Sequence, residues 1–229
     1  MEGGKGVIVC SVQKWCDLVK QLTAEQLDTL RHYPDIHCMI GIPSIRMREI
    51  LIEYMVQIYH PKTATFVVKP KVGIITATGV DVECIYGLKN RGLCVAKLLT
   101  EEESNFITSI PPHFLSKSTK NLVIDDLITD IIEGGSCDAD FVRMTALVLL
   151  GTVLAPKYSK IVPRNYYVLV NDLDRFNELN LNQFTLKTLI DGITACTTKA
   201  RKMNNFPDGN VSLLQVHTIL YCFYNFLHN

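Results

Sequence analysis

The longest apolar stretch of the chain predicts a buried central helix. Residues 141–156 read FVRMTALVLLGTVLAP and carry no charge between Arg143 and Pro156. This uncharged segment is shorter than the ~18–20 residues that a membrane-spanning helix needs. Asp138 or Asp140 can cap its N-terminus. Because a helix that is apolar on all sides is normally surrounded by others, we expect these residues to form the core of a helical bundle and not a membrane span.

Apolar positions at helical spacing predict a mainly α fold with a single bundle-like domain. We expect this domain over residues 23–229, after an N-terminal extension, residues 1–22, that contains a short helix. Thr23 and Gln26 match a capping box, so a helix should begin there and stop at Pro34. Further helices are expected over residues 43–59, 80–86, 100–107, 121–133, 140–154, 163–175, 181–203 and 211–227.

One segment has the composition of strands. Residues 63–78 read TATFVVKPKVGIITAT, are rich in β-branched residues and are interrupted by Lys69-Pro70-Lys71. This pattern predicts a small β-hairpin insert, the only sheet that we expect in the protein. A turn with the sequence GLKNRG follows the next short helix, and we expect Gly87 to have a positive φ there.

The charge balance argues against nucleic-acid binding. The 229 residues include 23 Lys plus Arg and 23 Asp plus Glu, so the formal net charge is zero. A neutral chain has no long-range field that attracts phosphates or anionic lipids. We therefore expect neither nucleic acid nor a membrane among its partners, and the sequence leaves the oligomeric state open.

The cysteines and the N-terminus indicate an intracellular protein. None of the 8 cysteines forms a CxxC pair, and their scatter among apolar residues is typical of reduced, mostly buried thiols. The opening MEGGKGVIVC lacks the long apolar core of a secretory signal. We expect the nucleus or the cytoplasm, while Lys5, Lys14 and Lys20 leave a mitochondrial location open.

An acidic cluster provides one alternative function. The stretch DDLITD, with Asp125, Asp126 and Asp130, resembles the aspartate-rich motif with which prenyl-transferring enzymes hold magnesium diphosphate. On a helix Asp126 and Asp130 share a face, so one divalent ion could bridge them. The spacing is one residue longer than in that motif, and NDLDRFNEL at residues 171–179 does not supply the second motif. We expect a solvated first helical turn and keep a magnesium-dependent enzyme as the alternative.

Other residues with catalytic chemistry are expected to be structural. Asp172 and Asp174 point about 200° apart on a helix, so we expect them to cap or to form ion pairs. Ser136 and Cys137 follow two glycines and have acidic neighbours, which predicts a turn between helices and not a nucleophile. The 6 histidines show no metal-ligand spacing. We expect no catalytic residue, no metal and no cofactor.

The last helix supplies a candidate partner-binding face. Residues 211–227 read VSLLQVHTILYCFYNFL, and their aromatic and aliphatic face contains Leu214, Ile219, Phe223 and Phe226. Packing onto the core would bury this face, whereas a helix left partly uncovered would offer it to another protein. Both interpretations stay open at the level of the sequence.

Three blocks of the sequence, taken together and in order, carry a resemblance. The first is GIITATGVDVECIYGLKNRG, residues 73–92. The second, residues 141–193, runs from the apolar helix through NDLDRFNEL, and the third is GNVSLLQ, residues 209–215. They resemble a plant domain of transposon-encoded proteins, often found ahead of a ubiquitin-like-protease domain and similar to plant mobile domains. The likeness spans about residues 22–227, with Lys89 where that domain usually has proline.

The resemblance implies a lineage-specific plant protein of transposon origin, here a stand-alone fragment without the protease. It carries over no catalytic residue. We therefore expect a non-enzymatic helical module that binds an unidentified protein partner. By analogy with orphan plant genes at hybrid-sterility loci, its role would lie in reproduction or gamete selection. A DNA-binding remnant of a transposase is a further alternative, which the neutral charge disfavours.

Overall fold

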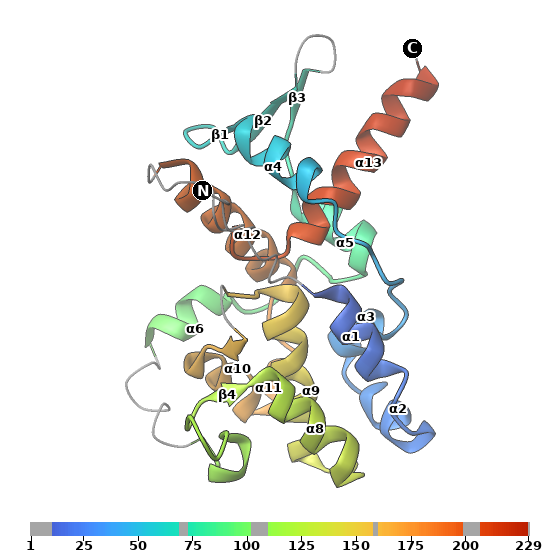
Figure 1. The fold of residues 1–229 in the computed structure, drawn as a ribbon, viewed down its shortest axis with the longest axis vertical. Helices are drawn as coiled ribbons and strands as arrows, with labels where there is room; N and C mark the ends of the chain where they lie inside the picture. The colour runs from blue at the N-terminus through green and yellow to red at the C-terminus, as the bar shows by residue number, and fades with distance from the viewer. Residues whose placement is uncertain (1–10, 69–72, 102–109, 158–159, 199–206, 229) are drawn as a thin grey trace, which may run out of the picture.

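Helices dominate the structure, and a small antiparallel sheet is inserted among them, as the hydrophobic pattern predicts (Figure 1). The computed structural model describes residues 11–68, 73–101, 110–157, 160–198 and 207–228. The strands are β1 (Tyr59–His60), β2 (Thr65–Val68), β3 (Gly73–Ile75), β4 (Leu122–Val123) and β5 (Ile161–Val162). The helices are α1 (Val12–Val19), α2 (Ala24–Leu30), α3 (Pro34–Ile40), α4 (Glu49–Gln57), α5 (Gly79–Tyr86), α6 (Val95–Glu101), α8 (Ile124–Gly134), α9 (Ala139–Leu149), α10 (Tyr167–Asn171), α11 (Leu173–Phe176), α12 (Leu181–Thr198) and α13 (Val211–His228).

The apolar run forms the core, as predicted. α9 continues into a π-helical turn, Leu150–Leu154, and Leu147, Leu149 and Leu150 are fully buried. Asp138 caps the helix, because its carboxylate accepts a hydrogen bond from the Phe141 N–H at 2.9 Å. α8 and α10 pack on α9, while α1 and α12 pack on the π-helical turn. In the described part of the chain, no helix has the length and apolar character that crossing a membrane requires.

The segment expected as an N-terminal extension contributes to the same core. Trp15 of α1 is fully buried, and its indole N–H donates to the Met39 carbonyl at 2.8 Å. Ser11, which caps α1, donates its backbone N–H to the Thr152 carbonyl of the π-helical turn at 2.8 Å. Residues 12–19 therefore belong to the packed body of the domain.

The predicted hairpin is present and gains a third strand. β2 pairs antiparallel with β3, β1 pairs antiparallel with β2, and the connection 69–72 lies outside the described residues. Tyr59, Phe66 and Ile75 align across the three strands and are buried, since alternate side chains of a strand share one face. The Tyr59 hydroxyl lies 3.1 Å from the Thr194 hydroxyl, so this face packs against α12.

The region around α2 confirms one prediction and corrects another. The capping box is formed, because the Gln26 N–H bonds to the Thr23 hydroxyl and the Thr23 N–H bonds to the Gln26 side chain at 3.0 Å. The predicted stop at Pro34 is wrong, since α2 ends at Leu30 and Pro34 begins α3. A proline fits the first turn of a helix, where its missing N–H leaves no hydrogen bond unmade.

The prediction of one sheet is also wrong, because β4 and β5 form a second, two-stranded antiparallel sheet. Leu122 pairs with Val162 and Val123 with Ile161. The helix expected from residue 121 therefore starts only at Ile124. Leu122 and Val162 are fully buried, so long-range packing decides the conformation of these two short segments.

Three other helix predictions are wrong in their bounds. The helix expected over residues 43–59 begins only at Glu49 and ends at Gln57. The helix expected over residues 100–107 begins at Val95, where apolar positions at helical spacing are buried, and residues 102–109 lie outside the described part. The helix expected over residues 163–175 divides into a 3-10 turn, Arg164–Tyr166, followed by α10 and α11. The break falls at Asp172, whose carboxylate caps α11 by accepting from the Asp174 and Arg175 N–H groups. This confirms the capping role predicted for Asp172.

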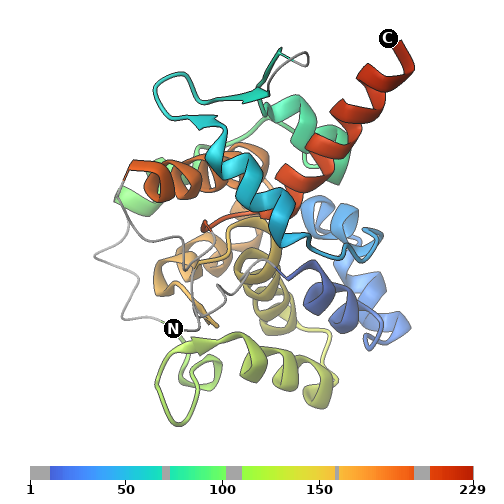
Figure 2. The same ribbon diagram turned by 45° about the horizontal axis from the view of Figure 1, so that its top comes forward.

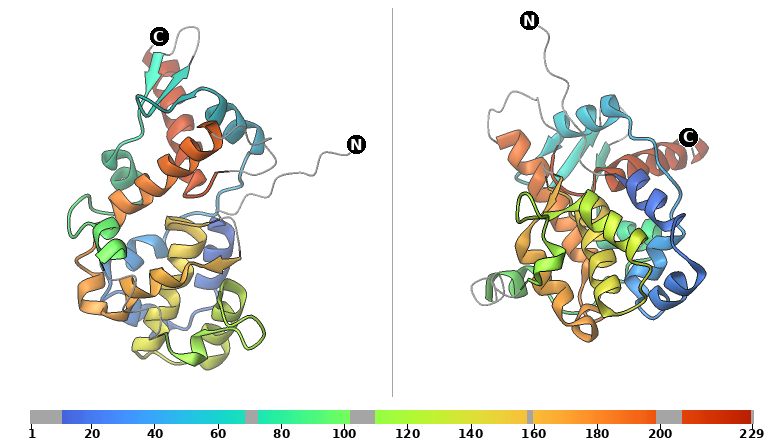
Figure 3. Two further views of the ribbon diagram at one scale, coloured as in Figure 1. Left: turned by 90° about the vertical axis from the view of Figure 1, so that its left-hand side faces the viewer. Right: turned by 60° about the horizontal axis from the view of Figure 1, so that its bottom comes forward.

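The elements gather at two ends that α12 connects (Figures 1 and 3). One end holds the three-stranded sheet with α4, α5 and α13, and the other holds α1–α3 and α8–α11. α13 begins beside α4 and α5, and its C-terminal half extends away from both (Figures 1 and 2). This extension leaves the C-terminal helix at the margin of the fold.

Candidate functional site

The three aspartates of the predicted magnesium cluster do not converge. Asp125 forms an ion pair with Lys14 of α1. Asp126 and Asp130 turn to a different side of α8, where they line a cleft of about 580 Å³ with His113 and Met144. Among the described residues, no three His, Cys, Asp or Glu side chains are placed to hold a metal ion. The first turn of α8 is thus an exposed acidic turn in which one carboxylate already has a cationic partner.

The predicted face of α13 is divided by the structure. Leu214 is fully buried in the core and cannot meet a partner, which corrects its assignment to that face. Ile219 is 38% exposed, so this member of the predicted set does lie at the surface. Phe223 and Phe226 lie outside the residues whose side chains the structure describes. The helix packs through its N-terminal half, where Val211, Leu213 and Leu214 are buried.

The polar residues of GNVSLLQ anchor α13. The Asn210 side chain accepts from the Leu213 N–H at 3.0 Å and thereby caps the helix. The Tyr86 hydroxyl of α5 lies 2.7 Å from the Ser212 hydroxyl and also donates to Asn210. The two hydroxyls and the Asn210 side-chain oxygen are thus joined by hydrogen bonds, so the third block of the resemblance has a structural role at the start of α13.

Gln215 binds a backbone segment from the other half of the sequence. Its side-chain oxygen accepts from the Arg48 N–H at 2.7 Å, and its side-chain nitrogen donates to the Arg46 carbonyl at 2.9 Å. The amide therefore pairs with the 46–48 backbone much as a neighbouring strand would. Gln215 is only 3% exposed, and its two bonds hold the start of α4 against α13.

A second polar junction connects the first two blocks of the resemblance. The fully buried Asn182 donates to the Gly79 carbonyl at 2.8 Å and to the Leu88 carbonyl at 2.7 Å. Asn180 donates to Asn90 of the GLKNRG turn, and its backbone N–H bonds to the Leu93 carbonyl. The quoted motifs therefore meet in space through hydrogen bonds that organise the backbone, and the junction contains no nucleophile or acid–base pair.

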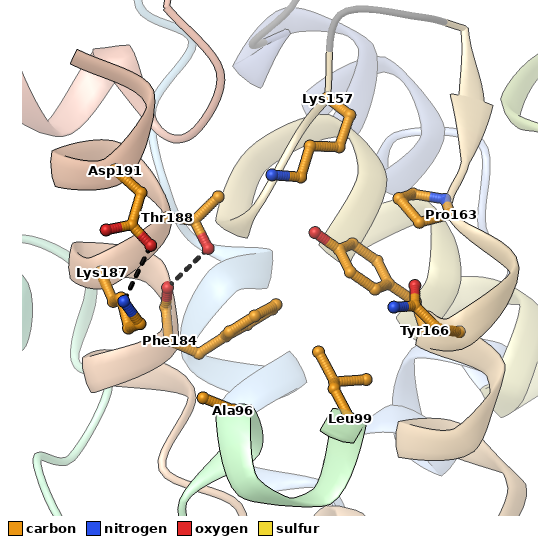
Figure 4. Close-up of a pocket in the computed structure, with 10 residues that line it drawn as sticks. Ala96, Leu99, Lys157, Pro163, Tyr166, Phe184, Lys187, Thr188 and Asp191 are labelled. Atoms are coloured by element: carbon orange, nitrogen blue, oxygen red, sulfur yellow. Dashed lines mark hydrogen bonds and ion pairs between the residues drawn. The ribbon is translucent and has the colours of Figure 1, made fainter. Parts of the chain in front are cut away.

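A hollow lies between α6, the Arg164–Tyr166 turn and α12 (Figure 4). It measures about 320 Å³, and the rings of Tyr166 and Phe184 face it together with Leu99 (Figure 4). The Tyr166 hydroxyl donates to the Ala155 carbonyl at 2.9 Å. Burial, with a smaller contribution from Asp208, raises the pKa of Tyr166 well above its usual range, so the phenol stays protonated.

The charged groups of this hollow are already paired. The Lys187 ammonium lies 2.9 Å from the Asp191 carboxylate, and Lys157 lies 3.8 Å from Asp208. Each lysine is thus balanced by its own aspartate, which leaves little net field to hold an anionic ligand. The hollow is therefore apolar in its centre and charge-balanced at its rim.

The thiols of the described residues do not form a reactive site. None of the six cysteines whose side chains the structure describes forms a disulfide, and they include the buried Cys16 and the exposed Cys84 and Cys94. The expectation of mostly buried thiols is therefore wrong for this set. Burial raises the pKa of Cys16, and burial together with Asp35 raises the pKa of Cys38 to about 12, which keeps both as thiols.

Asp35, in the first turn of α3, has a raised pKa. Burial raises its pKa to about 6, and the Lys89 ammonium opposes that rise. The folded state therefore holds this proton more tightly than the unfolded chain does. Asp35 therefore makes the fold progressively less stable as the pH rises from about 4 to about 6.

We expect Asp35→Asn to remove this pH dependence. Relative to the wild type, the variant should gain about 1–2 kcal/mol in free energy of unfolding across that window, a figure reduced for the partial exposure of the side chain. Urea unfolding at a series of pH values measures the difference. Asp28→Asn, at an exposed position of α2, is the control and should show no such trend. A wild-type-to-variant difference that stays constant with pH contradicts the prediction.

The start of α4 presents the most exposed apolar side chain of the described residues. Ile50 is 83% exposed and Tyr54, one turn later on the same face, is 40% exposed. They line an open groove of about 930 Å³ with Leu51 and Met47. Arg46, Arg48 and Glu49 complete it. We call the set of residues 46–51 and Tyr54 the α4 surface.

Comparisons with known proteins identify a family but no activity. No curated protein matches the chain. No solved structure matches it either, so the fold is described from its own elements alone. Residues 8–215 match the model of one family, and this match includes α1 and all three blocks quoted above. The chain therefore belongs to the family described as a domain of unknown function, DUF8566.

Proposed function

We propose that this domain acts by binding another protein, and that the α4 surface is its contact site. The observation that carries the proposal is the exposure of Ile50 and Tyr54 side by side in an open groove. Exposed apolar side chains that stand alone are common, whereas several in one groove with a polar rim are typical of a protein contact. Tyrosine and arginine are among the residue types that contribute most to the binding energy of such contacts, and both lie beside Ile50.

The start of α4 is held in place for this role. Gln215 fixes the backbone of residues 46–48, and the buried Ile52 and Met55 anchor the opposite side of α4. The contact residues thus project from a backbone that is already ordered. A prepared surface of this kind loses little conformational entropy when a partner binds.

Two alternatives receive less support. The magnesium-dependent enzyme requires Asp125, Asp126 and Asp130 to act together, but Asp125 is engaged by Lys14. Binding of DNA by a transposase remnant requires a basic surface, but Arg46 and Arg48 stand beside Glu49 and Glu53 in a chain of zero net charge. Recognition of a protein demands neither a convergent metal site nor an excess of positive charge.

The biological setting of the proposal depends on the sequence resemblance alone. We propose a lineage-specific plant protein of transposon origin that acts inside the cell, in reproduction or gamete selection. The support is the ordered likeness of residues 73–92, 141–193 and 209–215 to the plant transposon domain. Imaging of a tagged copy in plant reproductive tissue tests this part, and exclusion of the protein from those cells would count against it.

A photo-crosslinking experiment tests the contact site. A benzophenone amino acid at position 50 should give a discrete crosslinked product in cells that express the protein. The same group at position 25, an exposed site on α2, is the control and should not give that product. Mass spectrometry of the product identifies the partner. Equal labelling from both positions, or none from position 50, would refute the proposed site.

A further inference from the structure

Charges of both signs lie on the α4 surface and on Glu53 beside it, and they have no ion-pair partner among the described residues. Arg46, Arg48 and Glu49 are exposed and Glu53 is partly exposed. None of the four forms an ion pair with another residue that the structure describes. The two cations and two anions, Glu53 included, leave residues 46–53 without net charge, and they flank the apolar Ile50 and Tyr54 along the chain.

The neighbouring helix α13 has the opposite character. Its 18 residues include no Asp, Glu, Lys or Arg. The N-terminal half is packed on α4 and α5, whereas the C-terminal half extends away from them (Figures 1 and 2). Ile219, one turn beyond Gln215 and on the same side of the helix, is exposed. An exposed helix usually carries charged residues on its solvent face, and α13 has none, so an uncharged surface is the one that suits it.

Charge decides between the classes of partner. A strongly acidic partner would meet Glu49 and Glu53, and a strongly basic one would meet Arg46 and Arg48. Like charges brought together at an interface cost several kcal/mol. The partner surface that fits this region therefore has balanced charges where it meets α4 and no charges where it meets α13. A second copy of this chain has that pattern.

We propose that two copies associate about a two-fold axis through the α4 surface and α13. In such an interface residue i of one copy meets residue j of the other, and j meets i. Arg46 and Arg48 of each protomer then face Glu49 and Glu53 of its partner, while the uncharged helices α13 cover one another. The inference rests on the proposed function, because it names the partner for the same surface.

The mass of the protein in solution gives the first test. Sedimentation velocity at protein concentrations from about 1 to 100 μM should show a species of twice the 25.8 kDa of one chain. Ile50→Asp should shift the equilibrium toward the monomer by on the order of tenfold or more, since it places a charge at the interface centre. Ile50 is exposed, so the variant should keep the helical circular dichroism signal of the wild type. A wild-type monomer throughout this range overturns the inference.

Charge reversal gives a second test that a general loss of stability cannot imitate. One variant carries Arg46→Glu and Arg48→Glu, and the other carries Glu49→Arg and Glu53→Arg. Each alone brings like charges together across the axis and should dissociate, whereas an equimolar mixture restores opposite charges and should form heterodimers. A dimer that both variants leave intact, or a mixture that stays monomeric, overturns the assigned interface.

The crosslinking result separates this inference from the proposed function. A monomer in solution that crosslinks from position 50 to a different protein retains the proposed function and refutes self-association. A dimer that crosslinks from position 50 to its own chain supports self-association and the α4 surface as the contact site. A monomer that gives no product from position 50 refutes both.

Discussion

Replacing Leu149 with aspartate is expected to prevent the protein from folding. Leu149 is fully buried at the end of α9, and the neighbouring Leu147, Val148 and Leu150 are fully buried as well. Among the described residues no Lys or Arg is buried, so the core offers no such cation to pair with a new carboxylate. An unpaired buried charge costs several kcal/mol, which is comparable with the whole stability of a domain, typically about 5–15 kcal/mol.

The variant Leu149→Met separates the effect of charge from the effect of shape. Methionine has a similar volume and no charge, so this change should cost less than about 1.5 kcal/mol. Circular dichroism and thermal unfolding of both variants check the prediction. If Leu149→Asp remains soluble with the helical signal and melting temperature of the wild type, α9 is not the central helix that the burial indicates.

Replacing Gly92 with alanine is expected to have the second-largest effect. Gly92 ends the GLKNRG turn with φ +120°, a conformation that L-residues rarely adopt. A Cβ atom there would lie 2.3 Å from the Glu178 carbonyl oxygen, which belongs to the backbone and cannot move aside by a change of rotamer. The Leu93 N–H bonds to that same oxygen at 2.7 Å, so relief of the clash breaks the junction between the turn and α12.

We expect Gly92→Ala to lower the free energy of unfolding by about 3 kcal/mol or more, because backbone strain and a backbone clash act together. Gly135→Ala is the matched control. Gly135 also has positive φ, +59°, but a Cβ atom there meets no atom within 4 Å, so only strain of about 1–2 kcal/mol applies. Chemical denaturation of the two variants measures both values. Equal decreases in the free energy of unfolding for the two variants would show that the close approach to Glu178 does not contribute to the destabilisation.

The three blocks that carry the sequence resemblance share a structural explanation. Asn182 of the second block holds the Gly79 and Leu88 carbonyls of the first. Asn210 of the third block receives a hydrogen bond from Tyr86 of the first. Buried amides that each satisfy several backbone or side-chain groups tolerate few replacements, because any unmatched group costs free energy. The motif residues therefore specify the fold, while the candidate contact residues lie outside these blocks, at the start of α4.

Local patterns in the sequence determined the helical class, the hairpin and the buried core. The capping box at Thr23 and Gln26 and the uncharged run through Leu149 depend on neighbours a few residues away, so they can be read directly. Short segments were predicted less well. Leu122–Val123 pairs with a strand almost forty residues later, and its conformation depends on that contact.

Contacts between distant parts of the chain settle which polar residues meet and which surface is left exposed. Lys14 neutralises Asp125 from a helix 111 residues away, and Gln215 holds the Arg48 backbone across 167 residues. The one signal available in the sequence was a set of polar residues within the apolar start of α13, which require partners once they are buried. Ile50 resembles the buried residues around it in the sequence, and it stays exposed because Ile52 and Met55 take the side of α4 that faces the core. Periodicity identifies an apolar stripe, but the packing of distant elements decides which part of it is covered.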